Sequence, residues 1–489
     1  MVNEYLQKID SVIENGKYKD NWQSLSHHET PKWYRDAKFG IFIHWGVYSV
    51  PAFGNEWYSR NMYDKNQREY HHHIKTYGKH KDFGYKDFIP MFKGENFDAD
   101  EWASLFKESG AKYVMPVAEH HDGFAMFNTD FNRWNSVEMG PHRDVAGEIK
   151  QACEKQGLVY CASNHRAEHY FFMNMGRTFD SDVNDEKYAD FYGPAHYSKS
   201  FHSYMMKTSD ARAESPTEEF MKDWLLRNCE FVDRYQPKVV YFDWWIHNQA
   251  FKPYLQKFAA YYYNRAEEWG HEVSINYKHN AFPPNCATFD VERGALQDIS
   301  PVPWQTCTAI AKNSWGYTEN NKFKSVGHIV CDLIDIVSKN GMMLLNVGPK
   351  PDGTITKEET AVLKGIGKWF DVNGEGIYET TAWKTFGEGK TNVKAGFFQD
   401  NKKKGYTEKD FRFTYKDGCI YAFQMKPSKG DVVRIKTLKT IQDDLIINSI
   451  KLLGSDKKLK FERNKRYLAI SLDDRVQTDL PICFKIELR

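Results

Sequence analysis

Several common functional signatures are missing from this chain of 489 residues. It contains neither a GxGxxG nor a GxxxxGK(S/T) motif, so we expect no nucleotide and, more generally, no cofactor. Lysine and arginine number 67 and aspartate and glutamate 66, giving a net charge of +1, which argues against a general nucleic-acid-binding protein. No apolar run approaches the roughly 18 residues of a membrane span, and residues 1–20 are polar, so we expect neither a membrane segment nor a signal peptide.

Metal-binding cysteine patterns are missing too. The eight cysteines are scattered along the chain, and none has CxxC or other zinc-ligand spacing. Several lie inside apolar runs, such as Val159–Ala162 and Ile482–Phe484. We therefore expect buried free thiols and a reducing, cytoplasmic location.

Aromatic residues, in contrast, are abundant. The chain has 14 Trp, 29 Tyr and 33 Phe, or 16% of all residues. Composition alone favours bulky core filling. A second interpretation, in which a few of these rings stack on a ligand with apolar faces such as a sugar, depends on where the rings lie.

The first three quarters of the chain alternate short apolar runs with helical patterns. Helices are predicted within 98–110, 144–156, 215–235, 252–269 and 326–339, the third opening on Ser215–Glu218 as a capping box with Pro216 at the first helical position. Nearly continuous hydrophobicity is typical of strands buried on both faces of a parallel sheet. The predicted strands are 38–44, 113–118, 158–162, 239–242, 273–276 and 342–347.

Polar side chains at the ends of these runs favour a closed barrel over an open sheet. TIM-type barrels assemble their active sites from several strand ends on one face, whereas open sheets bind ligands at one switch point. We therefore predict an α/β fold with a (β/α)8-like (TIM-type) barrel over residues 1–375, six or seven of whose eight strands can be placed. The polar strand ends are His44, His120, His121, Asp122, Asn164, His165, Asp243 and Asn276.

The pattern changes after about residue 375. Residues 411–415, 433–436, 459–462 and 484–488 alternate polar and apolar side chains with no helix between them. Such alternation predicts an antiparallel β-sandwich over 376–489, with 381–410 as the boundary and a first strand. Within the barrel, the long polar stretch 176–216 is interpreted as an insertion loop near one end.

Two carboxylates are candidates for chemistry. Asp243 follows an apolar strand and is flanked by aromatics, which suits a nucleophile or the stabiliser of a positive, oxocarbenium-like centre; a simple turn role is the alternative. Glu292 lies beside Arg293, so a surface ion pair competes with a role as a second, initially protonated carboxyl.

Histidines and loop aromatics supply possible binding groups. His120 and His121 can converge where their strand ends, as hydroxyl-binding groups, as metal ligands with His44, or as ordinary loop residues. The HxH pair of many metal-dependent barrel hydrolases is missing, because the first strand ends in His44–Gly46. Glu56 and Trp57 either hold a sugar or pack on the barrel rim.

These motifs, in this order and spacing, resemble the α-L-fucosidases of glycoside hydrolase family 29. The resemblance covers roughly residues 30–370, and its most specific blocks are FGIFIHWG and HHDGF. The matching segments are Trp33–Gly46, Glu56–Tyr58, His120–Phe124, Tyr241–Asp243, Asn313–Tyr317 and Leu344–Pro349.

The resemblance implies a barrel followed by a β-sandwich and a retaining, exo-acting hydrolase that removes terminal α-L-fucose from glycans. It places the nucleophile on Asp243 and the general acid/base on Glu292, with Glu56 as the second choice. It implies no cofactor, no metal, no nucleic-acid or membrane partner, and allows a homo-oligomer. The substrate-binding residues it suggests, including two neighbours of Asp243, are His44, Glu56, Trp57, His120, His121, Tyr241, Trp245 and Trp315.

Two departures from the family pattern concern the site. A Tyr-Tyr-Ser run is replaced by Ala162–His169, so His165 or His169 is expected to fill the space near the nucleophile, and Tyr241 stands where Trp is frequent. We expect Trp244 and Trp304 to lie near the site, and 176–216 to shape the leaving-group subsite. Two rival hypotheses remain open: a metal-dependent barrel hydrolase using His44, His120 and His121, and a non-catalytic carbohydrate-binding protein.

Overall fold

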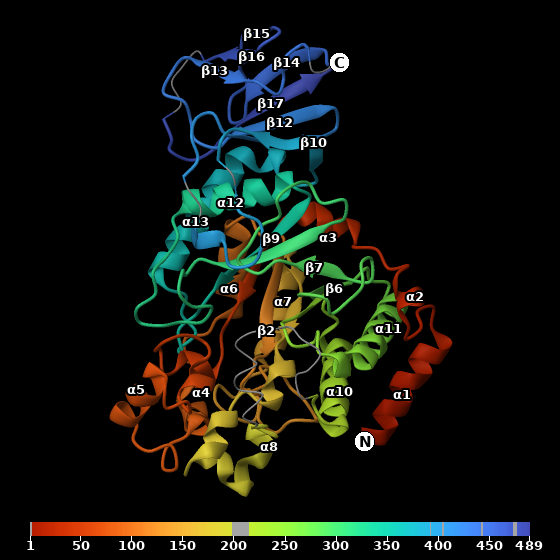
Figure 1. Ribbon diagram of the computed structural model, residues 1–489, viewed down its shortest axis with the longest axis vertical. Coiled ribbons are helices and arrows are strands. Elements are labelled where there is room, and N and C mark those ends of the chain that lie inside the picture. Colours follow the sequence, from red (N-terminus) through yellow and green to blue (C-terminus); the bar gives the residue numbers. More distant parts are fainter. Residues whose placement is uncertain (1, 198–214, 392, 403–404, 442–443, 473–476) are drawn as a thin grey trace.

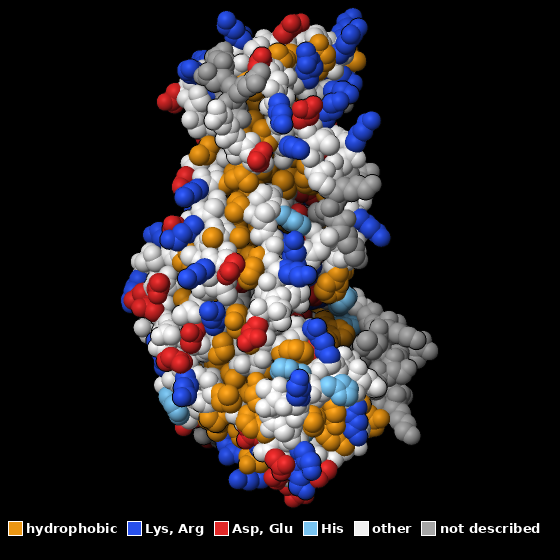
Figure 2. Space-filling model, turned by 90° about the vertical axis from the view of Figure 1, so that its left-hand side faces the viewer, with side chains coloured by type: hydrophobic (Ala, Val, Ile, Leu, Met, Phe, Trp, Pro, Cys, Tyr) orange, Lys and Arg blue, Asp and Glu red, His pale blue; other side chains and the backbone are white. Residues whose placement is uncertain are grey.

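The computed structural model of the protein describes residues 2–197, 215–391, 393–402, 405–441, 444–472 and 477–489. Figure 1 shows an elongated molecule with a barrel at one end and antiparallel sheets at the other. Lys and Arg side chains gather over the sheet end, while both charges are interspersed over the barrel (Figure 2). Among the described residues, no helix combines the length and apolarity that a membrane span requires.

Eight parallel strands form a closed barrel. They pair in the order β1-β9-β8-β7-β6-β5-β4-β2, and a β1–β2 ladder closes the ring. The third strand is interrupted at Cys161 and is therefore counted as β3 and β4. This confirms the predicted TIM-type fold. The strands are β1 (Phe39–Ile43), β2 (Tyr113–Glu119), β3 (Val159–Tyr160), β4 (Ala162–Asn164), β5 (Val239–Phe242), β6 (Ser274–Tyr277), β7 (Thr288–Asp290), β8 (Trp304–Ala309) and β9 (Gly341–Val347).

Helices cover the barrel, and several of them begin at side-chain caps. Asp98, Asp144 and Ser325 each accept a hydrogen bond from a backbone N–H of the first turn. Thr217 caps α10, so Pro216 precedes the cap, and its predicted place at the first helical position is wrong. The helices are α1 (Val2–Asn15), α2 (Trp22–Leu25), α3 (Lys32–Ala37), α4 (Tyr58–Asn61), α5 (Arg68–Thr76), α6 (Ala99–Glu108), α7 (Val145–Gln156), α8 (Ala189–Tyr192), α10 (Glu218–Tyr235), α11 (Lys252–Trp269), α12 (Val326–Ser338) and α13 (Lys357–Asn373).

The barrel interior is a packed core below its carboxyl-terminal end. Tyr34 and Tyr113 are fully buried, and both hydroxyls donate to Oε1 of Gln305, at 2.5 and 3.2 Å. Phe42 and Met115 pack in the same interior cluster. Because these side chains fill the interior, a ligand site is expected at the carboxyl-terminal ends of the strands, where the loops that follow the strands begin.

The C-terminal part is a sandwich of two antiparallel sheets, as predicted. A five-stranded sheet (β10-β11-β12-β17-β14) and a three-stranded sheet (β13-β16-β15) enclose a separate apolar cluster that includes Phe413 and Ile470. The predicted boundary at 375/376 lies between the end of α13 and the start of β10. The strands are β10 (Thr381–Glu388), β11 (Phe411–Lys416), β12 (Cys419–Gln424), β13 (Val432–Ile435), β14 (Ile447–Leu452), β15 (Phe461–Arg463), β16 (Leu468–Ser471) and β17 (Ile482–Leu488).

The predicted insertion loop is in part a packed segment. Residues 176–197 form short 3-10 turns and α8, and they bury Asp182, Phe191 and Tyr192. The part of the expected insertion loop that the structure describes is thus built from short turns, and it packs apolar side chains that its polar composition did not indicate. Residues 198–214 lie outside the described residues. The eight cysteines are free thiols, as expected, and seven of them are buried.

Candidate active site

A cavity of about 670 Å³ opens at the carboxyl-terminal ends of the barrel strands. Of the predicted site residues, it brings together both carboxylates, all three histidines and most of the aromatics. Its lining residues are Phe42, His44, Asn55, Glu56, Trp57, His120, His121, His165, Tyr241, Asp243, Trp244, His247, Lys278, His279, Glu292, Cys307, Trp315, Phe397 and Phe398.

Asp243, which directly follows β5, accepts contacts from four donors. His165 Nδ1 lies 2.9 Å and His121 Nε2 3.3 Å from its Oδ2. Lys278 Nζ lies 2.5 Å from Oδ1, which also accepts the backbone N–H of Trp244 at 2.8 Å. Only 13% of the side chain is exposed, so water cannot solvate the carboxylate fully. The four contacts stabilise its charge instead and fix its position.

Lys278 joins the two candidate carboxylates. It lies directly after β6, and its Nζ contacts Asp243 at 2.5 Å and Glu292 Oε2 at 2.6 Å. Its side chain is 4% exposed, so this cation is shielded from water. Sequence reasoning missed Lys278, because a lysine after a strand is usually a solvated loop residue.

The two carboxylates are shifted in opposite directions. Burial alone would raise the pKa of Asp243, but Lys278 and His165 outweigh it and hold that pKa well below its usual range. Burial raises the pKa of Glu292, and the negative charge of Asp243 adds to this effect against the pull of Lys278. The pair therefore offers one ionised carboxylate and one carboxyl that holds its proton more tightly.

A cluster of histidine rings covers one side of the cavity. His44 Nδ1 is hydrogen-bonded to Asn346 Oδ1 at 2.6 Å, and the His120 ring lies 4.4 Å from that of His121. His165 contacts Asp243, so it fills the space near that carboxylate. His169 instead bonds the backbone oxygen of His121 and is not among the cavity-lining residues.

The protonation states of these rings differ. Burial lowers the pKa of His44 and His120 well below the usual range and that of His165 to about 4, so these rings are neutral near pH 7. Burial would also lower the pKa of His121, but Glu168 and Asp243 outweigh it and raise the pKa. Neutral imidazoles both donate and accept hydrogen bonds, which suits recognition of hydroxyl groups.

The histidine geometry bears on the metal hypothesis. Ring nitrogens of His44, His120 and His165 lie within 4.8 Å of one another, whereas His121 groups with Asp243 and not with His44. Both ring nitrogens of His165 already have partners, Asp243 and the hydroxyl of Ser163. A metal there would have to break one of these contacts, so the donor set fits hydroxyl binding better than a metal centre.

Tryptophans form the walls. Trp57 and Trp244 stack with ring centroids 6.3 Å apart. Trp315 is held from two sides, since its backbone N–H donates to Glu56 Oε2 at 2.9 Å and its carbonyl accepts from Asn346 at 2.7 Å. Glu56 therefore has a positioning contact already, which weakens its case as an acid/base.

Two predicted aromatics are not brought to the cavity. Trp304 begins β8, at the opposite end of the barrel, and donates to the carbonyl of Lys339, so the expectation that it lies near the site is wrong. Trp245 is 4% exposed, packs on Phe171, and is not among the lining residues. Its neighbour Trp244 lines the cavity in its place.

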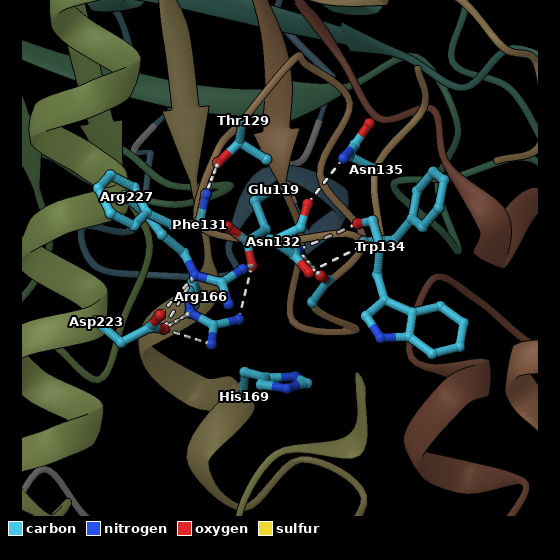
Figure 3. Close-up of polar contacts among 12 residues, drawn as sticks. Glu119, Thr129, Phe131, Asn132, Trp134, Asn135, Arg166, His169, Asp223 and Arg227 are labelled. Carbon is cyan, nitrogen blue, oxygen red and sulfur yellow. Dashed lines mark hydrogen bonds and ion pairs between the residues drawn. The ribbon is translucent and has the colours of Figure 1, made fainter. Parts of the chain in front are cut away.

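Figure 3 shows an ion-pair network of Glu119, Arg166, Asp223 and Arg227. Arg166 contacts Glu119 at 2.7 Å and Asp223 at 2.6 Å, and Arg227 reaches the same two carboxylates. Glu119 precedes His120, and Arg166 follows His165. The network therefore ties α10 to two strand ends that are followed by the cavity-lining His120 and His165.

A closed barrel whose strand-end cavity pairs two carboxylates among aromatic rings is an arrangement typical of glycoside hydrolases. A family model described as α-L-fucosidase matches residues 5–375. The chain therefore belongs to the α-L-fucosidase family, as the motifs indicated.

Similar proteins agree with this assignment. The chain is 28% identical to the tissue α-L-fucosidase of Rattus norvegicus, over 86% of this chain and 82% of the rat protein. It is 31% identical to the plasma α-L-fucosidase of Homo sapiens, over 76% of this chain and 73% of the human protein. A solved structure of Thermotoga maritima α-fucosidase in complex with fucose is similar with a TM-score of 0.74 and 29% identity, covering 96% of this chain and all of that one.

Proposed function

We propose that this chain is a retaining, exo-acting α-L-fucosidase with Asp243 as nucleophile and Glu292 as general acid/base. The observation that carries the proposal is the Lys278 bridge between two carboxylates whose pKa values move apart. In many hydrolases, two carboxyl groups whose pKa values are shifted in opposite directions act as an ionised nucleophile and a protonated acid.

The reaction proceeds in two displacements. The ionised Asp243 attacks the anomeric carbon of fucose, while the carboxyl proton of Glu292 passes to the leaving oxygen as its bond to that carbon breaks. Glu292, now a carboxylate, takes a proton from water, whose oxygen attacks the same carbon and releases fucose and Asp243. The neutral histidines and Trp57 and Trp315 bind the sugar hydroxyls and ring faces.

The spacing of the two carboxylates supports retention. Both lie within 2.6 Å of one nitrogen, so the two contacting oxygens are no more than about 5 Å apart. Retaining glycosidases have carboxyl groups about 5–5.5 Å apart, whereas inverting enzymes need roughly 6.5–9.5 Å for a water molecule. The packed side chains of the barrel interior close the inner end of the cavity, so a glycan chain cannot pass through it. This supports exo action on a terminal α-L-fucosyl residue.

Product stereochemistry tests the proposal directly. Proton NMR of aryl α-L-fucoside hydrolysis should show α-L-fucose as the first product, before mutarotation. Incubation with 2-fluoro-fucosyl fluoride should add one sugar mass to the peptide that contains Asp243. First appearance of the β anomer, or a label on another carboxylate, would contradict the mechanism.

Replacement of Lys278 by methionine is expected to move both limbs of the pH profile of kcat/KM upward. Lys278 lowers the pKa of Asp243 and of Glu292, so its removal raises both. The acidic limb reports protonation of the nucleophile and the basic limb ionisation of the acid, and each should shift by about 1–3 pH units. Lys278→Arg keeps a cation and should retain limbs close to those of the unsubstituted enzyme, while unshifted limbs in Lys278→Met would refute the role.

A further inference from the structure

A segment of the C-terminal part returns to the barrel. Between β10 and β11 the chain leaves the sandwich, and Gly396 forms an antiparallel bridge with Ala295, its N–H donating to the Ala295 carbonyl at 2.9 Å. This stretch lies beyond residue 375, where the match to the family model ends. It is nevertheless in contact with the loop that carries Glu292.

Backbone hydrogen bonds fix this segment against the acid/base loop. The N–H of Phe398 donates to the Glu292 carbonyl at 3.0 Å, and those of Gln399 and Asp400 donate to the Arg293 carbonyl at 2.8 and 2.9 Å. Phe398 and Arg293 both have positive φ, at 55° and 45°. Non-glycine residues hold this conformation only where their surroundings impose it.

Asp400 anchors the segment through its side chain. Its Oδ2 accepts from Lys324 Nζ at 2.6 Å and from Thr308 Oγ1 at 2.8 Å, and Arg293 lies 3.4 Å away. Lys324 is fully buried, so these contacts are shielded from water. The segment is therefore built into the barrel rim and holds a defined position there.

The segment completes a row of rings along the cavity mouth. Phe397 stacks on His279 with centroids 5.1 Å apart, His279 lies 5.0 Å from His247, and His247 stacks on Trp244 at 6.4 Å. Phe398 also lines the cavity, yet 55% of it is exposed, which makes it one of the most exposed large apolar side chains among the described residues. An exposed aromatic held in a constrained backbone at a cavity mouth points to a ligand contact.

We propose that Phe398 and the row Phe397, His279 and His247 form the leaving-group subsite, which takes a second sugar ring attached to fucose. Phe398 offers its face to the apolar side of that ring, and the imidazoles hydrogen-bond its hydroxyls. Burial lowers the pKa of His247 to about 4 and also lowers that of His279, so these groups are neutral partners for hydroxyls and do not attract anions. This inference rests on the proposed fucosidase function, and it builds the subsite from Phe397 and Phe398 of the C-terminal segment and two histidines of the barrel loops. No described residue of 176–216, the segment expected to shape it, lines the cavity.

Two substrates with different leaving groups test the subsite. Fucosyllactose places a sugar against Phe398, whereas the fluoride of α-L-fucosyl fluoride is too small to reach it. In Phe398→Ala, the ratio of kcat/KM for fucosyllactose to that for the fluoride should fall about tenfold, the loss of one stacked ring. Phe398→Tyr keeps the ring and should restore the ratio. Phe461→Ala, an aromatic 36% exposed on β15, is the matched control and should leave the ratio unchanged.

The outcomes separate the subsite from the function itself. The subsite proposal would be overturned if Phe398→Ala had the same ratio of kcat/KM values as the unsubstituted enzyme, whether both values were unchanged or both fell by the same factor. If the unsubstituted enzyme hydrolyses neither substrate, the fucosidase proposal fails instead.

Discussion

Replacing Asp243 by alanine is expected to lower kcat/KM for an aryl α-L-fucoside by roughly 10⁴-fold or more, while the protein remains folded. The proposed reaction needs a carboxylate that attacks the anomeric carbon. Glu292, which also contacts Lys278, cannot replace it, because it serves as the proton donor. The leaving group of an aryl fucoside needs little protonation, so the loss isolates the nucleophile. Initial rates over a range of substrate concentrations provide the measurement.

The folded state should tolerate this substitution. Loss of the Asp243 charge lowers the pKa of Glu292, so Glu292 ionises more readily and its carboxylate can pair with the buried Lys278 cation. Azide gives a sharper readout than the rate alone, because it can occupy the vacated space and attack the anomeric carbon from the same face, giving β-L-fucosyl azide. Near-normal turnover by Asp243→Ala without azide would rule out the assignment of the nucleophile.

The strand ends were the part of the site that the sequence could predict. His44, His120 and Asp243 each follow a nearly continuous apolar run, and the barrel brings such ends together at one face. β7 and β8 were harder to predict. β7 has only three residues. β8 carries Gln305, which forms hydrogen bonds in the barrel interior, and Thr306, which lies on the opposite face and donates to the backbone carbonyl of Val291, so polar side chains on both faces replace the expected apolar pattern.

The groups that could not be predicted depend on contacts distant in the chain. Lys278 looks like a solvated loop residue until barrel closure places Asp243 and Glu292 around it. Phe398 belongs to a stretch assigned to the sandwich boundary, and only hydrogen bonds to the Glu292 loop bring it to the cavity. The misplacement of Trp304 has the same origin, because without β8 there was no way to tell which end of the strand carried it.

Replacing Glu292 by glutamine is expected to impair cleavage in proportion to how much the leaving group needs a proton. The amide keeps the size of the side chain and can still accept from Lys278, but it has no proton to transfer. With fucosyllactose, kcat/KM should fall by about 10²- to 10⁴-fold, the typical contribution of a general acid. With α-L-fucosyl fluoride, which needs no such protonation, kcat/KM should change far less.

The pH profile and Glu56 decide whether Glu292 is the acid. Because burial and Asp243 raise the pKa of Glu292, the unsubstituted enzyme should lose activity as the pH rises through that pKa, and this basic limb should vanish in Glu292→Gln. Glu56 is the rival carboxyl, and it already accepts from Ser314 and from the backbone of Trp315. Glu56→Gln should therefore keep the basic limb and affect both substrates similarly. The opposite result would be a Glu56→Gln enzyme that still hydrolyses α-L-fucosyl fluoride, no longer hydrolyses fucosyllactose and has no basic limb. Glu56 would then be the acid, and Glu292 would serve only to hold Lys278 beside the nucleophile Asp243.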